Sequence, residues 1–383
     1  MNQYVRHYDP FDLPITGYAD RLSVAGGEAI AFHVSTTDTA FDAELIRPGR
    51  KPELDEAVPS DLKGRYPGKL QRIHTGSHGV VAGGVDLPED AEITLDLMPT
   101  LPATGHDQGI ITWGPDTGLF LNADGCLCLK WGGKAASLPG PLRRGEWYAL
   151  RLYLDGAASR VVAQIDPCRA GHPRIEAAID GAAATLAGTD FRLSGWRNGD
   201  HTTGCLNGKI AAPRIFSPSR GVVAAWDFSV GHDTDRAPDT GPHGRHMALH
   251  HHPRRAVTGP RWRGRVTDFR FAPDEYDAVA FHREDMTDAG WEKSLTWIVP
   301  GDLPSGIYAL RITCADGQDH IPFVVLPDPA ATRNRVAFLA PTFSYLAYAN
   351  EQHWWPAPDI REVTGGTLDE VLSPAEKWAN AVG

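Results

Sequence analysis

The sequence predicts a mainly β protein made of two β-sandwiches, one inserted into the other, followed by the start of an α/β domain. The composition is the first indication, because 40 Gly and 30 Pro among 383 residues separate many short alternating segments. Similar short segments at 14–50 and 266–327 enclose a longer β-rich stretch. The continuous apolar run 336–340 is typical of a strand buried on both faces of a parallel sheet.

The two outer segments predict a single immunoglobulin-like sandwich. Residues 29–35 and 43–47 have the pattern of antiparallel strands, and 303–327 has the form of a closing hairpin. Further short strands are expected at 266–271, 278–281, 295–298, 306–313 and 321–326. We therefore expect residues 1–70 and 265–328 to form one sandwich, since surface loops tolerate long insertions at little entropic cost. A linear string of separate domains is the alternative.

The inserted stretch, residues 71–264, predicts a larger two-sheet sandwich. Strands such as AEITLDLM (91–98) alternate with turns such as Asn122-Ala123-Asp124-Gly125 and Asp155-Gly156. The succession of ITLDL, GLFLNADGCLCLK and GEWYALRLYLDG resembles a laminin-G or concanavalin-like jelly roll, with Trp147 before a core strand. A fold of this kind carries little information about function.

Charge and composition exclude several classes of protein. The net charge of −11 is spread along the chain, so neither nucleic acid nor an anionic membrane surface is an expected partner. The first residues lack the apolar segment of a signal peptide, and no window is long and apolar enough to span a membrane. Five widely spaced cysteines without a C-x-x-C motif predict reduced thiols in a cytoplasmic protein.

Few motifs indicate chemistry. Nucleophile-elbow, zincin, P-loop and dinucleotide-binding patterns are missing, and Ser77 within Thr75–Gly79 is better explained as part of a turn. The weak metal candidates are His243, His250 and His252, because a strand would place the last two on one face.

Other candidates have simpler explanations. Asn122 and Asp124 could hold calcium, but a hairpin turn explains them equally well. Cys126 and Cys128 would lie on one face of a strand, where two small core residues are the simpler interpretation. Trp196, Trp354 and Trp355 could stack on sugars or line an interface.

The segment after residue 328 predicts the beginning of an α/β domain. Ligands of open α/β sheets bind beyond the carboxyl ends of the strands, so the polar residues that follow the run 336–340 are pocket candidates. They are Thr342, Tyr345, Tyr348 and Asn350. A helix is expected to begin near 346–350 and another over 367–382, with Ser373 as N-cap and Pro374 in the first turn.

Three segments together resemble the large (beta) subunit of N,N-dimethylformamidase and its relatives. They are GYADRLSVAGGEAIAFHVST (17–36), LPSGIYALRI with IPFVVLP (303–327) and NRVAFLAPTFSYLAYAN (334–350). The resemblance implies an immunoglobulin-like part and an inserted laminin-G-like part before a Rossmann-like catalytic domain. It also implies hydrolysis of small N-substituted amides to an amine and a carboxylate, a mononuclear iron, and a small helical partner subunit.

The resemblance covers only the front portion of the family's chain. The family's iron ligands lie downstream of the last matched segment, so no ligand is carried over, and we expect no cofactor in this chain alone. Ordering the roughly 50 residues of 335–383 costs on the order of 75 kcal/mol, more than one strand and short helices can offset. We expect an incomplete α/β start in a truncated or split large subunit, inactive alone and completed by another chain. The alternative is a non-catalytic, lectin-like carbohydrate-binding or scaffold protein.

Overall fold

The chain folds into two compact units in a computed structural model that describes residues 13–49, 54–168, 173–181, 186, 188, 190–328, 336 and 338–348. The smaller unit is formed by two separate segments, its described residues up to Gln71 and those from Trp291 onward. The larger unit comprises Arg72–Gly290 and is inserted between them. Each unit has its own hydrophobic core and is described by itself.

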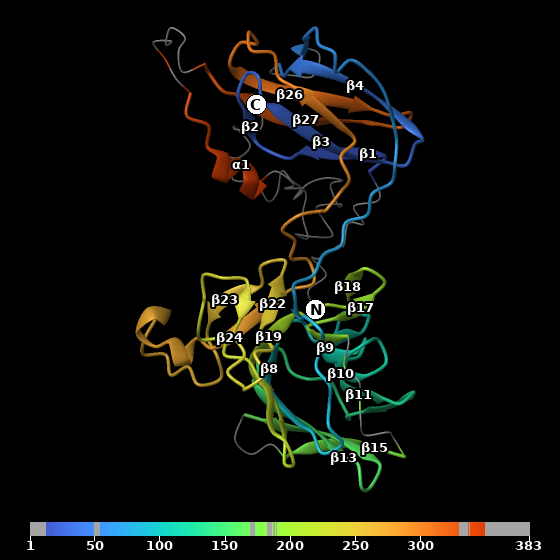
Figure 1. Cartoon of the computed structure of the whole chain (residues 1–383), viewed down its shortest axis with the longest axis vertical. Coiled ribbons are helices and arrows are strands. Elements are labelled where there is room, and N and C mark those ends of the chain that lie inside the picture. Colours follow the sequence, from blue (N-terminus) through green and yellow to red (C-terminus); the bar gives the residue numbers. More distant parts are fainter. Residues whose placement is uncertain are drawn as a thin grey trace, which may run out of the picture. The chain divides into compact units, whose positions relative to one another are not determined.

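The smaller unit is a sandwich of a three-stranded and a six-stranded sheet. The three-stranded sheet has the order β1-β3-β25, and the larger one has the order β2-β27-β26-β4-β5, with β6 also paired to β4 (Figure 1). The strands are β1 (Ile15–Ala19), β2 (Ser23–Val24), β3 (Ala29–Thr36), β4 (Ala40–Arg47), β5 (Glu56–Ala57), β6 (Gly64–Pro67), β25 (Leu295–Ile298), β26 (Gly306–Thr313) and β27 (Gln318–Val325).

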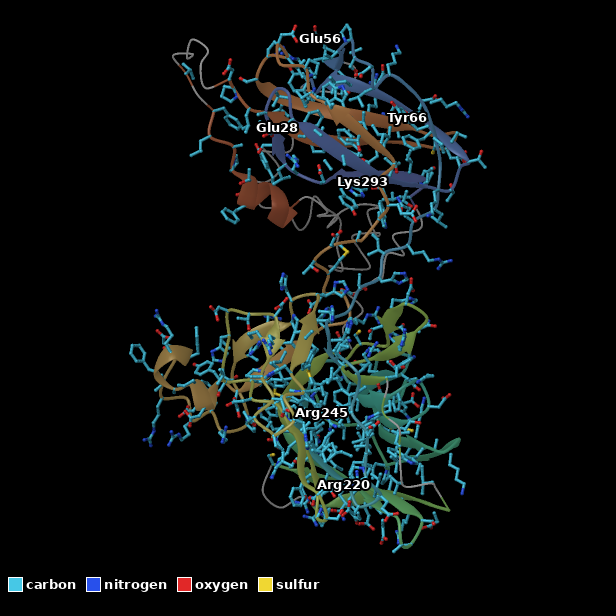
Figure 2. The ribbon with its side chains drawn as sticks, viewed as in Figure 1. Glu28, Glu56, Tyr66, Arg220, Arg245 and Lys293 are labelled. Atoms are coloured by element: carbon cyan, nitrogen blue, oxygen red, sulfur yellow. The ribbon has the colours of Figure 1, made fainter. Side chains whose placement is uncertain are left out.

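Pairing between the two segments closes this sandwich. Phe32 of β3 lies opposite Leu295 of β25, so the residues that precede the insertion pair directly with those that follow it. Phe32 and Phe323 meet edge to face in the core, at 5.6 Å between ring centroids. Tyr66, labelled in Figure 2, stacks on Phe41 and donates its hydroxyl to the Leu62 carbonyl. Residues 54–70 contribute β5 and β6, which both pair with β4.

The larger unit is a sandwich of two eight-stranded sheets. One has the order β12-β11-β10-β9-β16-β7-β22-β21, and the other the order β15-β14-β13-β8-β19-β24-β23, with β20 also paired to β19. A separate hairpin, β17-β18, is formed by Trp196–Asn198 and His201–Thr203. The remaining strands are β7 (His78–Val81), β8 (Glu92–Pro99), β9 (Gln108–Trp113), β10 (Gly118–Leu121), β11 (Leu127–Trp131), β12 (Lys134–Ser137), β13 (Tyr148–Asp155), β14 (Arg160–Pro167), β15 (Ile175–Asp180), β16 (Phe191–Leu193), β19 (Gly208–Ser217), β20 (Gly221–Ala225), β21 (Arg236–Ala237), β22 (Met247–His250), β23 (Arg254–Val257) and β24 (Ala278–Phe281).

Alternation of apolar and polar residues explains the core of the larger unit. In β8 every second side chain is buried, and the same holds at most positions of the neighbouring β13. The buried faces of the two sheets enclose an aromatic cluster, in which Phe191 stacks on Trp226 and meets Trp113 edge to face. The predicted mainly β architecture with a jelly-roll-like insertion is confirmed.

Two segments expected in the smaller sandwich lie in the larger unit. The residues 278–281 form β24, which pairs with β19 and β23 of the larger sheet. Residues 266–271 form no strand, because Asp268 accepts a hydrogen bond from the Arg270 backbone and caps the 3-10 turn η3 (Phe269–Phe271). A second 3-10 turn, η4 (Pro273–Glu275), follows directly.

The expected strand at 336–340 is not formed in the described part of this run. Val336, Phe338 and Leu339 are 84%, 72% and 92% exposed. A buried strand needs neighbouring strands that bond its backbone and cover both of its faces, and no described strand pairs with these residues. The helix α1 (Thr342–Tyr348) begins directly after Pro341, earlier than expected. The helix expected over 367–382 lies outside the described residues.

Candidate functional site

The predicted pocket residues of the last segment are only partly described. Thr342 begins α1 and its backbone N–H donates to the Ala340 carbonyl at 2.9 Å. Tyr345 is 51% exposed, and Tyr348 ends the helix. Asn350 lies outside the described residues. The described part of this segment presents aromatic and apolar side chains to solvent.

The three histidines proposed as metal ligands are not brought together. Strand β22 ends at His250, and His251 and His252 have φ angles of 60° and 47°, so the alternation that would place His250 and His252 on one face stops. His243 lies in the loop before β22. Among the described residues, no three His, Cys, Asp or Glu side chains form a group that could hold a metal ion.

His250 instead stacks on a histidine of the neighbouring strand. His78 of β7 lies opposite His250 in register, and their rings are nearly parallel with centroids 5.0 Å apart. His251 approaches the same ring at 5.9 Å. Sequence reasoning missed this cluster, because the pairing of β7 with β22 is not visible in local patterns.

The surroundings of His78, His250 and His251 favour the uncharged form of each imidazole. The pKa of His78 is lowered to about 4, mainly by burial and also by the nearby His250, His251 and Arg192, while a hydrogen bond to the Gly76 carbonyl opposes the shift. Burial also lowers the pKa of His250 and that of His251. A buried imidazole with a pKa near 4 is uncharged at neutral pH and acts here as a packing element.

The expectation of a turn around Ser77 is wrong, because Ser77 lies in the segment directly before β7 and its side chain bonds residues far away in sequence. Its side chain is fully buried, and its hydroxyl donates to Asp285 at 2.6 Å and accepts from the His282 backbone N–H at 3.0 Å. The hydroxyl of Ser194 donates to the Ser77 carbonyl. These bonds tie the entry and the exit of the inserted unit together, and leave Ser77 without access to a substrate.

The residues considered for calcium or sugar binding have internal partners. The side-chain oxygen of Asn122 accepts from the backbone N–H groups of Asp124 and Cys126, which is the geometry of a turn. Trp196 packs against Phe120 at 5.7 Å between ring centroids, and its ring lies directly over Gly204. Cys126 and Cys128 are free thiols, the second of them buried. Trp354 and Trp355 lie outside the described residues.

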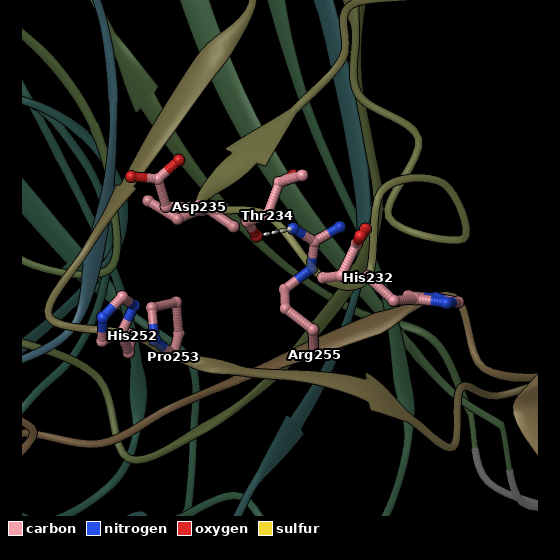
Figure 3. Close-up of a pocket in the computed structure, with 8 residues that line it drawn as sticks. His232, Thr234, Asp235, His252, Pro253 and Arg255 are labelled. Carbon is pink, nitrogen blue, oxygen red and sulfur yellow. Dashed lines mark hydrogen bonds between the residues drawn. The ribbon is translucent and has the colours of Figure 1, made fainter.

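A cavity lies where the chain passes from one sheet of the larger unit to the other. It has a volume of about 640 Å³ and is formed by the loop before β21 and the turn between β22 and β23 (Figure 3). Its lining residues are His232, Asp233, Thr234, Asp235, Leu249, His252, Pro253 and Arg255. In the sequence, only the abundance of Asp and His residues at 227–262 pointed to this cavity.

Arg255 is fixed at the side of this cavity by backbone carbonyls. Its guanidinium donates to the carbonyls of Thr234, Arg236, Phe228 and Val230 at 3.1, 3.2, 3.4 and 2.9 Å. Burial lowers the pKa of Arg255, and Asp227 and Asp233 oppose that shift. Four of its five N–H donors are therefore used to shape the loop.

Two further lining residues are also engaged in the structure. His232 donates through Nε2 to the Tyr276 carbonyl at 3.2 Å and meets Phe269 edge to face. The hydroxyl of Thr234 donates to the carbonyls of Gly231 and Arg236. The carboxylates of Asp233 and Asp235 and the imidazole of His252 form no hydrogen bond or ion pair with other described residues. The buried Nε of Arg255 also has no hydrogen-bond partner among them.

The described residues form a multidomain β protein, in which one sandwich is inserted into the chain of the other and contains the cavity. The family described as N,N-dimethylformamidase beta subunit-like, C-terminal, matches residues 254–379. The N,N-dimethylformamidase beta subunit of Alcaligenes sp is 33% identical, over 93% of this chain and 55% of the relative. That of Paracoccus aminophilus is 31% identical, over 92% of this chain and 54% of the relative.

This chain belongs to the N,N-dimethylformamidase beta subunit family, as its sequence motifs predicted. The chain spans about half the length of the curated relatives it matches.

Similarity to solved structures is low. A pentraxin from Limulus polyphemus matches with a TM-score of 0.26 and 11% identity, covering 46% of this chain and 76% of the pentraxin. Domains LG4-5 of the mouse laminin alpha1 chain match with a TM-score of 0.21 and 18% identity, covering 43% and 48%. The description of the fold therefore rests on the strand order given above. Within the described residues, no helix has the length and apolarity needed to cross a bilayer.

Proposed function

We propose that this chain forms the β-sandwich portion of an N,N-dimethylformamidase-like amidohydrolase, which hydrolyses small N-substituted amides to an amine and a carboxylate. The proposal is supported by relatives with that name, which match over more than nine-tenths of the chain. On this proposal the two sandwiches serve as scaffold and subunit contact, and the chain alone has no amidase activity.

The observation that carries the proposal is the exposed apolar segment after the smaller sandwich. Phe338, Leu339 and Phe343 are 72%, 92% and 89% exposed. We propose that these three exposed apolar side chains, which are close in sequence, mark a protein interface. We propose that this segment packs against an α/β catalytic domain, and that a small helical subunit completes the assembly.

The family resemblance also implies iron, and the described residues do not fit such a site. No group of three His, Cys, Asp or Glu side chains among them could hold a metal ion. We therefore assign no iron ligand to the described residues and derive no catalytic step from them. We further propose a cytoplasmic location, where the five cysteines, all free thiols, would stay reduced.

Co-expression tests the proposal. The full chain is expressed alone and together with candidate partner chains, and amine release from N,N-dimethylformamide is measured. We expect activity and a stable complex only in the combined sample. A double variant, Leu339→Ser with Phe343→Ser, should weaken complex formation because it removes the apolar contact.

A matched control is Leu101→Ser, which changes an exposed leucine of the inserted unit. It should leave the complex unchanged. Amide hydrolysis by the pure chain, or a complex that forms equally well with the double variant, would refute the proposed division of roles.

A further inference from the structure

A segment between β23 and β24 protrudes from the larger unit and exposes aromatic side chains. It comprises residues 258–277 with the turns η3 and η4, and lies next to β23 in Figure 1. Phe271 is 80% exposed and Trp262 is 45% exposed. Aromatic side chains carry much of the binding energy of protein interfaces. We call residues 258–277 the aromatic arm.

Ion pairs brace the aromatic arm, with buried carboxylates and exposed guanidinium groups. Arg263 donates to Glu275 at 2.7 Å, and the two side chains are 69% and 3% exposed. Arg261 donates to Asp277 at 2.7 Å, and the two side chains are 65% and 7% exposed. The arm therefore hides its negative charges and presents its positive charges to solvent.

The exposed charges of the aromatic arm are mostly positive. Its exposed charged residues are Arg261, Arg263, Arg265, Arg270 and Asp274. Over the whole segment, four arginines balance four acidic residues, so the net charge of −11 belongs to the rest of the chain. The surface of the arm is thus complementary to an acidic surface.

An acidic surface adjoins the aromatic arm in the same copy. It is the acidic loop, residues 230–235 before β21. Its exposed apolar and acidic side chains are Val230, Asp233 and Asp235. The two carboxylates form no ion pair with other described residues. His232 joins the loop to the arm, because its ring meets Phe269 edge to face with centroids 4.9 Å apart.

Two surfaces of opposite charge, placed side by side, form a self-complementary face. In a two-fold dimer every contact occurs twice, so the arm of each copy can lie on the acidic loop of the other. Contact of arm with arm would oppose the exposed arginines and is disfavoured. Because the acidic loop lies directly beside the arm, a second copy offers a partner for both halves of the face.

We propose that two copies of this chain associate through the aromatic arm and the acidic loop. Phe271 and Trp262 of each copy pack on Val230 of the other, and the exposed arginines of the arm face Asp233 and Asp235. The inference goes beyond the proposed function, because these residues all belong to the inserted unit. If no dimer forms, the proposed function stands unchanged.

Sedimentation velocity of the full chain at about 1 to 100 μM tests the proposal, since interfaces of moderate strength dissociate in this range. We expect a reversible dimer. Its dissociation constant should rise with salt, because exposed charges are screened. Phe271→Ser should raise the dissociation constant by about tenfold or more, because the lost aromatic contact occurs twice.

Charge reversal shows whether the partner is a second copy. Asp235→Arg reverses a charge of the acidic loop, and Arg265→Glu reverses a charge of the arm. Each should weaken the dimer about tenfold, because like charges then meet in both contacts. An equimolar mixture of the two variants should restore the dimer, since one contact keeps its native charges and the other pairs the two reversals.

The matched control is Asp116→Arg, which reverses an exposed charge in a turn elsewhere in the same unit. It should dimerise as the unaltered chain does, and thermal unfolding of each variant verifies that it is folded. A chain that stays monomeric at every concentration would overturn the proposal. A dimer that Phe271→Ser leaves unchanged, or a mixture no more dimeric than its two components, would also overturn it. Binding of a co-expressed partner chain by a monomeric chain, lost in Phe271→Ser, would assign the face to that partner instead.

Discussion

His78 makes the larger unit sensitive to acid, and the size of the effect follows from its burial. The ring is 8% exposed, and its pKa falls from the ordinary 6.5 to about 4, mainly because burial disfavours the charged form. A drop from 6.5 to about 4 corresponds to about 3 kcal/mol, since one pKa unit is worth about 1.36 kcal/mol. Because the folded state binds the proton more weakly than the unfolded state, stability is complete above pH 6.5. It is lost as the pH falls from 6.5 toward 4.

The variant His78→Asn separates the loss of stability caused by protonation of His78 from that caused by other ionisable groups. The Nδ1–H of His78 donates to the Gly76 carbonyl at 2.9 Å, and the Asn side-chain amide can supply a similar donor without titrating. Urea unfolding followed by tryptophan fluorescence gives the free energy of unfolding of the larger unit from pH 8 to pH 4. We expect the variant to lose about 3 kcal/mol less than the unaltered chain over this range.

The control His243→Asn makes the same change in an exposed loop of the same unit. Parallel pH profiles for the unaltered chain and His78→Asn would refute the reasoning. They would mean that His78 keeps an ordinary proton affinity despite its burial and its neighbours Arg192, His250 and His251.

Three further predictions concern packing and reactivity in the larger unit. Phe191→Ala should lower the free energy of unfolding by about 3–5 kcal/mol in urea titrations, because this fully buried ring lies between two tryptophans. Gly204→Ala should lower the melting temperature and change tryptophan fluorescence, because a Cβ there would lie 2.0 Å from the Trp196 ring. Gly199→Ala has a similar φ but open space around its Cβ and should cost less, so equal effects would contradict the packing argument. Iodoacetamide followed by mass spectrometry should label Cys168, which is exposed, before Cys205, whose pKa burial raises to about 12.

The sequence by itself determined the architecture of this protein because the signals for it are local. Alternation with a period of two predicted strands such as β8 and β13, and the turn at Asn122 followed from its residue types. The motifs at 17–36 and 303–327, one on each side of the insertion, predicted the family to which the chain belongs.

Contacts between distant segments were decided only by the tertiary structure. The register of β7 against β22 places His78 on His250, and positive φ angles at His251 and His252 redirect the chain away from the predicted metal site. The run 336–340 has the composition of a buried strand, but the described strands do not pair with it. A buried strand requires partner strands that can lie far away in sequence, and local patterns carry no information about where those partners lie.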